Sequence, residues 1–258
     1  MSAPLAFITG ASSGIGQALA ARYYRAGWRL ALVARRAADM HRFVQAQGFE
    51  PARVAVYGAD VSDLASITTA GRECIGAHGL PDVVIANAGI SVGIDTAQYA
   101  DLEVMRRTFD TNNLGMAATF QPFVRAMRER KAGTLVGIAS VAGIRGLPGH
   151  GAYCASKAAV IGYCESLRGE CRPHGVKVVT IVPGYIATPL TQGNPYSMPF
   201  LMQPADFADH AYRAIDAGTT YLVIPWQMGV VAKLLRALPN VVFDRLLAGR
   251  PRKPRATQ

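Results

Sequence analysis

Short apolar segments alternate with longer segments of helical periodicity along most of the chain. The short segments are β-branched and apolar at successive positions, as in strands that are covered on both faces. We predict strands at 5–9, 29–34, 53–58, 83–86, 134–139, 177–182 and 221–224. Between them, apolar positions three and four residues apart predict helices near 14–26, 37–47, 63–77, 99–130, 151–172 and 204–216.

Strands that alternate with helices indicate right-handed βαβ units. We therefore expect an α/β fold with a Rossmann-type, doubly wound, seven-stranded parallel sheet and helices on both faces. No repeat or linker interrupts the pattern before about residue 249, so we predict a single domain whose main body is residues 1–228.

Residues 229–258 form a different kind of segment. Their apolar positions follow helical spacing, but Pro239 and Asn240 interrupt it, which predicts two short helices. The tail that follows, Arg250–Arg255, is basic and is expected to lack fixed structure. One hypothesis is an interfacial membrane anchor with cations near lipid headgroups. The favoured hypothesis is a helical extension of the same domain, or an appendage, that covers a pocket or packs on another subunit, because two short helices bury little.

Composition narrows the function classes. Half of the 258 residues are hydrophobic and 17% are charged, which suits a large core and argues against disorder. The net charge is +10, but four of the cations lie in the last nine residues, so the body is only mildly basic. A small ligand that carries phosphates fits this charge, and no nucleic-acid motif accompanies it, so we expect no nucleic-acid partner.

The cysteines and the N-terminus point to a reducing compartment. Cys74, Cys154, Cys164 and Cys171 form no CxxC pair and have no histidine cluster nearby, so we expect reduced thiols and no metal. The first residues, MSAPLAFITG, lack the basic and apolar regions of a secretion signal. No segment approaches the ~20 apolar residues of a membrane span. We therefore expect a cytoplasmic protein.

A glycine-rich turn joins the first strand to the first helix. It has the sequence Thr9-Gly10-Ala11-Ser12-Ser13-Gly14-Ile15-Gly16. Glycines let a phosphate approach the backbone, and the helix N-terminus offers unpaired N–H groups and a positive dipole end. This predicts a pyrophosphate site, although the glycine spacing differs from the common GxGxxG dinucleotide motif.

The end of the second strand indicates which dinucleotide is preferred. An acid at this place binds a ribose 2′-hydroxyl, whereas an arginine accommodates a 2′-phosphate. Arg35 and Arg36 follow the strand, and no acid stands there. NADP is therefore predicted in preference to NAD. The sequence does not decide which of the two arginines binds the 2′-phosphate, and the other is then a structural or surface charge.

Three residues provide a site for proton transfer. Ser140 ends the fifth strand, and Tyr153 and Lys157 follow four residues apart, on one face of a predicted helix. A phenol has a pKa of about 10. An ammonium ~6 Å away favours the phenolate by roughly 3 kcal/mol at a dielectric of ~20, or about two pKa units. We therefore predict that Tyr153 exchanges a proton with a carbonyl or alcohol oxygen that Ser140 holds.

These motifs together resemble the short-chain dehydrogenase/reductase family, in its shorter, non-extended branch, over roughly residues 4–225. The glycine turn matches the family's TGxxxGxG signature. Four further elements match: Asp60-Val61, Asn87-Ala88-Gly89, the NxxG element at 112–115 and the PGxxxT element at 183–188. The resemblance implies the catalytic residues Asn112, Ser140, Tyr153 and Lys157, with Asn113 as the alternative to Asn112. It implies a cofactor site made of Gly10, Ser12, Ser13, Gly14, Ile15, Gly16, Arg35, Arg36, Asp60, Val61, Asn87, Ala88, Gly89, Tyr153, Lys157, Pro183, Gly184, Ile186 and Thr188.

The family's roles give the expected reaction. Hydride passes between NADPH and a carbonyl carbon while Tyr153 protonates the oxygen, Lys157 binds the nicotinamide ribose, and Asn112 kinks its helix and holds a relay water. A non-catalytic NADP-binding regulator is the alternative, and the intact Ser140, Tyr153 and Lys157 count against it. The family also implies a homodimer or homotetramer that pairs helices such as 99–130 and 151–172.

Three loops are expected to select a substrate with a hydrophobic body. They follow Asn87, Ser140 and Pro183. Their apolar residues are Ile90, Val92, Ile94, Val141, Ile144, Leu147, Tyr185, Tyr196, Met198, Phe200, Leu201 and Met202. An alternative is that the last group only packs as a lid.

Overall fold

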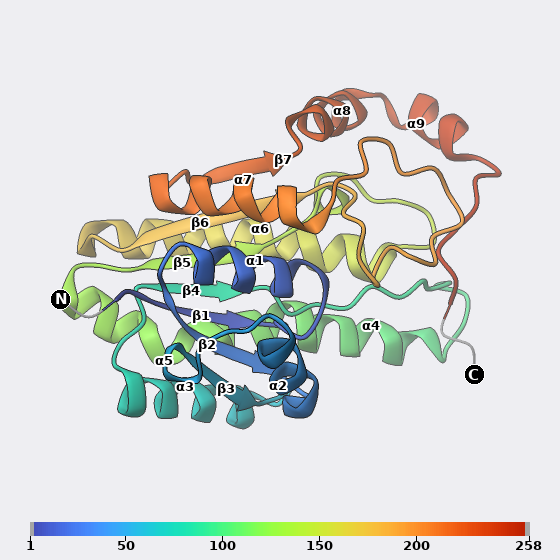
Figure 1. The fold of residues 1–258 in the computed structure, drawn as a ribbon. Coiled ribbons are helices and arrows are strands. Elements are labelled where there is room, and N and C mark those ends of the chain that lie inside the picture. Colours follow the sequence, from blue (N-terminus) through green and yellow to red (C-terminus); the bar gives the residue numbers. More distant parts are fainter. Residues whose placement is uncertain (1–2, 256–258) are drawn as a thin grey trace.

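Seven parallel strands form one sheet in the order β3-β2-β1-β4-β5-β6-β7 (Figure 1). The computed structural model describes residues 3–255. The strands are β1 Leu5–Thr9, β2 Arg29–Ala34, β3 Val54–Gly58, β4 Val83–Ala86, β5 Thr134–Ile138, β6 Lys177–Pro183 and β7 Tyr221–Ile224. The predicted Rossmann-type fold is confirmed, with strand ends that differ from expectation by one residue at most.

Helices cover both faces of the sheet (Figure 1). One face carries α1 Gly14–Arg25, α2 Ala37–Ala46 and α7 Pro204–Ala217, and the other carries α3 Leu64–His78, α5 Gly115–Arg130 and α6 Gly151–Cys171. Successive side chains of β1 point to opposite faces, so Phe7 packs in the core on the α5 side and Ile8 in the core on the α1 side. This two-sided burial explains why the strands read as continuous apolar runs.

The strand order reverses next to β1, which has β2 on one side and β4 on the other. Parallel sheets leave a crevice at such a point, beyond the carboxyl ends of the strands. Thr9, Ala34, Ala86 and Ile138 end their strands there. The segments predicted to bind cofactor and substrate therefore meet at one edge.

The predicted helix at 99–130 is not continuous. It consists of α4 Asp101–Phe109, a π-helical turn at Asp110–Leu114, and α5. The side chain of Asn112 turns inward here, and its amide hydrogen-bonds both backbone groups of Ile90. Single π-helical turns within α-helices are a recognised cause of such a break and are frequent at functional sites.

Two short helices, α8 Trp226–Ala237 and α9 Asn240–Leu247, follow β7 as the sequence predicts. Arg145, from the loop after β5, holds their junction. Its guanidinium donates to the carbonyl oxygens of Leu235, Arg236 and Leu238 and to Oδ1 of Asn240. The same group stacks 3.9 Å from the centre of the Phe243 ring. One side chain thus satisfies the carbonyls at the end of α8 and contacts α9.

The expectation that the basic tail lacks structure is wrong for its described residues, 250–255. Arg255 makes two hydrogen bonds to the carboxylate of Asp101, which is buried. The backbone N–H of Gly93 donates to Pro254, and Lys253 donates to the carbonyl of Leu190. The tail is held because α4 offers a buried acid, a feature that the composition of the tail itself does not reveal.

Substitution of Arg145 by alanine is predicted to loosen α8 and α9. It leaves four acceptors without their charged donor, and hydrogen bonds to charged groups contribute ~1.5–3 kcal/mol. We expect faster amide exchange in residues 226–247 and a lower melting temperature. The control Arg125→Ala removes an exposed ion pair with Glu129 and is expected to change stability little. Equal exchange in both variants would contradict the clamp.

Candidate active site

The glycine turn is packed tightly against the end of β4. The Asn87 amide donates to the carbonyl oxygens of Thr9 and Gly10, and the Thr9 hydroxyl accepts from the N–H groups of Asn87 and Ala88. Gly10 has a φ of +65°, and a Cβ there would lie 2.7 Å from Cα of Ala88. Asn87 therefore fixes the conformation of the turn, and it also lines the crevice.

The N-terminus of α1 points its backbone donors into the same crevice. Ser13 precedes the helix without a side-chain cap, and the first turn holds no acid. A Cβ on Gly16 would lie 2.2 Å from the carbonyl oxygen of Gly10, so only glycine lets the turn close this far. Uncapped N–H groups, a positive dipole end and a closely packed glycine turn fit a pyrophosphate.

The two arginines after β2 differ in their surroundings. Arg35 is exposed and lines the crevice. Arg36 is paired with Asp39 at the start of α2 and does not line it. Asp60 and Val61, after β3, line the crevice beside Arg35. Of the two arginines, Arg35 is therefore the one placed at the crevice.

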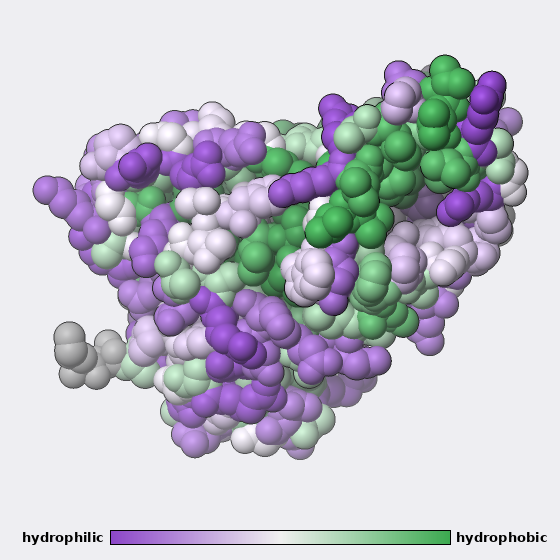
Figure 2. Space-filling view, turned by 90° about the horizontal axis from the view of Figure 1, so that it is seen from above, coloured by the Kyte–Doolittle hydropathy of each residue, from purple (hydrophilic) through white to green (hydrophobic). Residues whose placement is uncertain are grey.

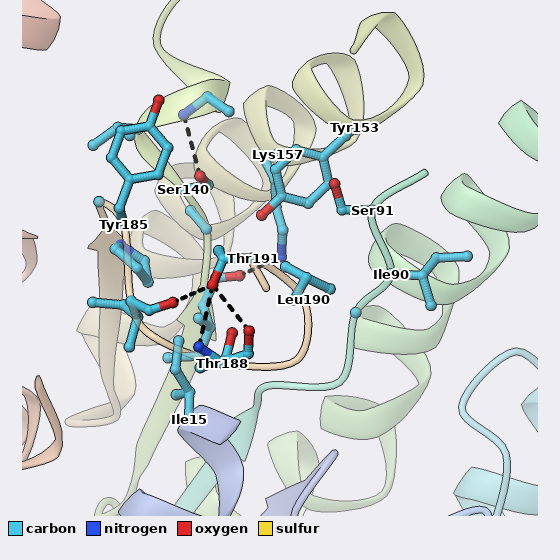
Figure 3. A pocket seen from close by; sticks show the side chains of 18 of the residues that line it. Ile15, Ile90, Ser91, Ser140, Tyr153, Lys157, Tyr185, Thr188, Leu190 and Thr191 are labelled. Carbon is cyan, nitrogen blue, oxygen red and sulfur yellow. Dashed lines mark hydrogen bonds between the residues drawn. The ribbon is translucent and has the colours of Figure 1, made fainter. Parts of the chain in front are cut away.

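Ser140, Tyr153 and Lys157 come together at the end of β5 (Figure 3). Ser140 and Lys157 are buried, Tyr153 is partly buried, and the Lys157 ammonium lies 5.8 Å from the centre of the Tyr153 ring. Lys157 donates to the carbonyl oxygen of Ile138, the last residue of β5. The Tyr153 hydroxyl points to the side on which Ser140 lies (Figure 3).

The expected lowering of the tyrosine pKa is wrong for the chain by itself. Burial raises the pKa of Tyr153 to about 12, and contact with the Ser140 hydroxyl only partly opposes this. Burial also lowers the pKa of Lys157 to about 8. The expectation from sequence included the attraction between the charges but not the loss of solvent around both groups. At neutral pH Tyr153 is a protonated phenol, and Lys157 is still mainly an ammonium.

Asn112 stands beside this group. A Cβ on Gly89 would lie 3.2 Å from Oδ1 of Asn112 and 3.4 Å from Nζ of Lys157, so both side chains border the same backbone position. Asn112 also donates to Oγ of Ser156. Asn113 donates only to the carbonyl oxygen of Ser156. Asn112, and not its neighbour, occupies the place next to the lysine.

The loop after β6 closes the other wall of the crevice. Pro183, Gly184, Ile186 and Thr188 line it. The Thr191 hydroxyl donates to the carbonyl oxygen of Ile186 and accepts from the N–H of Thr188 (Figure 3). The sequence does not predict this role of Thr191, because no motif in the loop after β6 marks a side chain that hydrogen-bonds its own backbone.

These elements enclose one cavity of about 630 Å³. Eighteen of the predicted site residues line it, whereas Gly16, Arg36 and Asn112 do not. Of the residues expected to select substrate, Ile90, Val141, Leu147, Tyr185 and Tyr196 line the cavity, and Val92, Ile94, Ile144, Met198, Phe200, Leu201 and Met202 do not. Phe200 and Leu201 are about half exposed, at 50% and 46%.

The C-terminal segment lines the cavity, which is one of the two arrangements that the favoured hypothesis gave for it. α8 and α9 provide a set of apolar lining residues, and the tail adds Lys253. The helical residues are Met228, Val231, Ala232, Leu235, Phe243, Leu246 and Leu247. The helical spacing of apolar residues in 226–247 indicates that these helices have an apolar face. The spacing does not identify which part of the protein that face covers.

Within residues 3–255, no group of His, Cys, Asp and Glu side chains is arranged to hold a metal ion. All four cysteines are buried and free, as expected for reduced thiols. Within the same range, no helix has both the length and the apolar character needed to cross a membrane.

Comparisons with known proteins agree with this geometry. Residues 4–197 match the family model for short chain dehydrogenase. An uncharacterized oxidoreductase of Myxococcus xanthus is 41% identical over 249 residues, which cover 95% of this chain and 96% of that protein. The chain belongs to the short chain dehydrogenase family, and it is an NAD(P)-dependent dehydrogenase or reductase.

Solved structures show the same fold. A short-chain dehydrogenase from Streptomyces avermitilis superposes with a TM-score of 0.79 at 28% identity, over 90% of this chain and 92% of that chain. An alcohol dehydrogenase from Thermococcus sibiricus, complexed with 5-hydroxy-NADP, gives a TM-score of 0.75 at 27% identity, over 86% and 96% of the two chains.

The two neighbouring asparagines are predicted to differ in their effect on stability. Asn112→Ala leaves the backbone groups of Ile90 and the Ser156 hydroxyl without their buried partner, and each such group costs about 1–3 kcal/mol. Asn113→Ala removes one hydrogen bond, worth about 1 kcal/mol. Urea unfolding of both variants measures the difference, and an equal or larger loss for Asn113→Ala would refute the assignment.

Proposed function

We propose that this protein is an NADPH-dependent carbonyl reductase that acts on a substrate with a hydrophobic body. The observation that carries the proposal is that Ser140, Tyr153 and Lys157 line the same cavity as the glycine turn. Uncapped N–H groups and the fit of Gly10 and Gly16 support a dinucleotide at the other end.

The raised pKa of Tyr153 means that the chain by itself holds the proton that reduction of a carbonyl requires. A phenol that is protonated at neutral pH can donate its proton to a carbonyl oxygen as charge develops there. The Ser140 hydroxyl donates to the same oxygen and holds it in place. A bound reduced nicotinamide supplies the hydride. Lys157 keeps a positive charge beside Tyr153, and this charge stabilises the phenolate that is left behind.

We infer that Asn112 is a positioning residue for the group formed by Ser140, Tyr153 and Lys157. Its amide fixes the loop at Ile90 and lies beside Gly89 and Lys157. We infer that it keeps the lysine side chain in line with a proton path toward Tyr153. The residue that makes these bonds lies in the π-helical turn, a feature that is frequent at functional sites.

Preference for NADP rests on Arg35. Its guanidinium lines the cavity without an acid at the strand end, where a 2′-phosphate would bind it by charge-assisted hydrogen bonds. The alcohol dehydrogenase from Thermococcus sibiricus is described as complexed with 5-hydroxy-NADP, which is consistent with this choice.

The substrate end of the cavity is apolar with a few polar groups. Tyr185 and Tyr196 line it together with residues of α8 and α9. His150 hydrogen-bonds the Tyr196 hydroxyl over 3.0 Å, and burial lowers its pKa, so the imidazole is neutral at neutral pH. His150 therefore positions Tyr196 without adding charge, and the cavity favours a largely uncharged, hydrophobic carbonyl compound.

Tyr153→Phe is predicted to bind NADPH as the wild type does and to lose turnover by about 10²–10⁴-fold, because only the proton donor is removed. Oxidation of NADPH with a panel of ketones and aldehydes measures turnover, and fluorescence titration measures cofactor binding. The control is Tyr163→Phe, on the same helix but outside the cavity. Full turnover in Tyr153→Phe would overturn the proposed function.

Arg35→Ser is predicted to weaken NADPH binding by roughly 10- to 100-fold, the equivalent of about 1.5–3 kcal/mol, and to leave NADH binding nearly unchanged. Arg36→Ser serves as the matched control, because Arg36 pairs with Asp39 away from the cavity. A larger effect at Arg36 would transfer the phosphate contact to that residue.

A further inference from the structure

An apolar surface runs along the outside of α8 and α9 (Figure 2). Trp226, Val230 and Leu234 recur at intervals of four on α8, so they form one stripe of that helix. Their exposed fractions are 70%, 47% and 64%. Val241 and Val242 extend the surface on α9, and Val241 is 61% exposed. We call these five residues the outer face.

The outer face is separate from the packing of the fold. Each helix already buries another side: Met228 and Ala232 of α8 and Phe243 of α9 are buried and line the cavity. A helix that only covers a pocket is expected to carry polar residues on its solvent side. Here both sides are apolar, and exposed apolar surfaces of this kind mark interaction sites.

Positive charge surrounds the outer face. Residues 226–255 contain seven lysines and arginines and one acid, Asp244. Lys233, Arg236, Arg245 and Arg250 are exposed, and within residues 3–255 none of these four takes part in an ion pair. Short helices with exposed large apolar side chains and neighbouring cations are suited to the interface of an anionic bilayer.

The same charges argue against a second copy of the chain as the occupant. A twofold dimer through this face would place the patch against itself. The exposed cations of one copy would then lie opposite those of the other, and like charges across an interface are unfavourable. An anionic surface is the partner whose charge is complementary.

We propose that α8 and α9 dock on a membrane surface that contains anionic lipids, with the outer face inserted among the headgroups. Leu246 and Arg250 are exposed and also line the cavity, so the cavity reaches the surface beside the outer face. A hydrophobic substrate can then pass from the bilayer to Tyr153. The docking is peripheral and does not depend on catalysis or on a bound cofactor.

The two tryptophans allow a direct test. Trp226 lies in the outer face, whereas Trp28 packs against Tyr23 near α7 and is partly buried. In the full-length Trp28→Phe variant, Trp226 is the only tryptophan. Mixing with vesicles of equal parts phosphatidylcholine and phosphatidylglycerol is expected to shift its emission to the blue. Pure phosphatidylcholine is expected to bind at least tenfold more weakly, and high salt should weaken binding to the anionic vesicles.

Co-sedimentation of the wild type and of Leu234→Ser/Val241→Ser provides the second readout. Neither residue lines the cavity, so the double variant should keep its reductase activity while vesicle binding falls at least tenfold. The matched control is Tyr99→Ser/Leu102→Ser, which changes two exposed residues at α4 (88% and 52%) and should bind as the wild type does. Circular dichroism confirms that each variant is folded.

The proposal is overturned if the Trp226 emission does not move and the wild type stays in the supernatant. It is also overturned if both double variants lose binding equally. If Leu234→Ser/Val241→Ser instead changes the mass measured by light scattering, while neither the wild type nor any variant binds vesicles, the outer face is an interface between copies.

Discussion

A buried ammonium beside a partly buried phenol is the constraint around which this site is organised. Lys157 is kept in an apolar region by one carbonyl, that of Ile138, and by its place on α6 four residues after Tyr153. Such a pair requires the end of β5, the first turns of α6 and the loop at Gly89 to keep their relative positions. The tightly packed parallel sheet supplies this rigidity, since all these segments leave from its carboxyl edge.

Much of the fold and of the site could be predicted because the relevant signals are local. Apolar runs covered on both sides identify strands such as β1 and β6, and Tyr153 and Lys157 need only a helix to share a face. The glycine turn is in part equally local, because a Cβ on Gly16 would meet the carbonyl oxygen of Gly10 within the turn. In such places sequence spacing translates directly into geometry.

What could not be predicted depends on contacts between distant segments or on burial. Arg255 finds Asp101, and Arg145 finds the end of α8, across separations of 154 and 90 residues or more. Arg35 and Arg36 are equivalent in the sequence pattern, and only the ion pair between Arg36 and Asp39 distinguishes them in the structure. The pKa of Tyr153 moved opposite to expectation, because desolvation is a property of the packed cavity and not of residue spacing.

The position of Arg145 has a consequence for how the cavity opens. This residue follows Ser140 by five positions, and its guanidinium holds the junction of the two C-terminal helices. The segment that follows Ser140 is therefore tied to the two helices that line the cavity. A displacement of those helices would have to break these hydrogen bonds or move that segment with them.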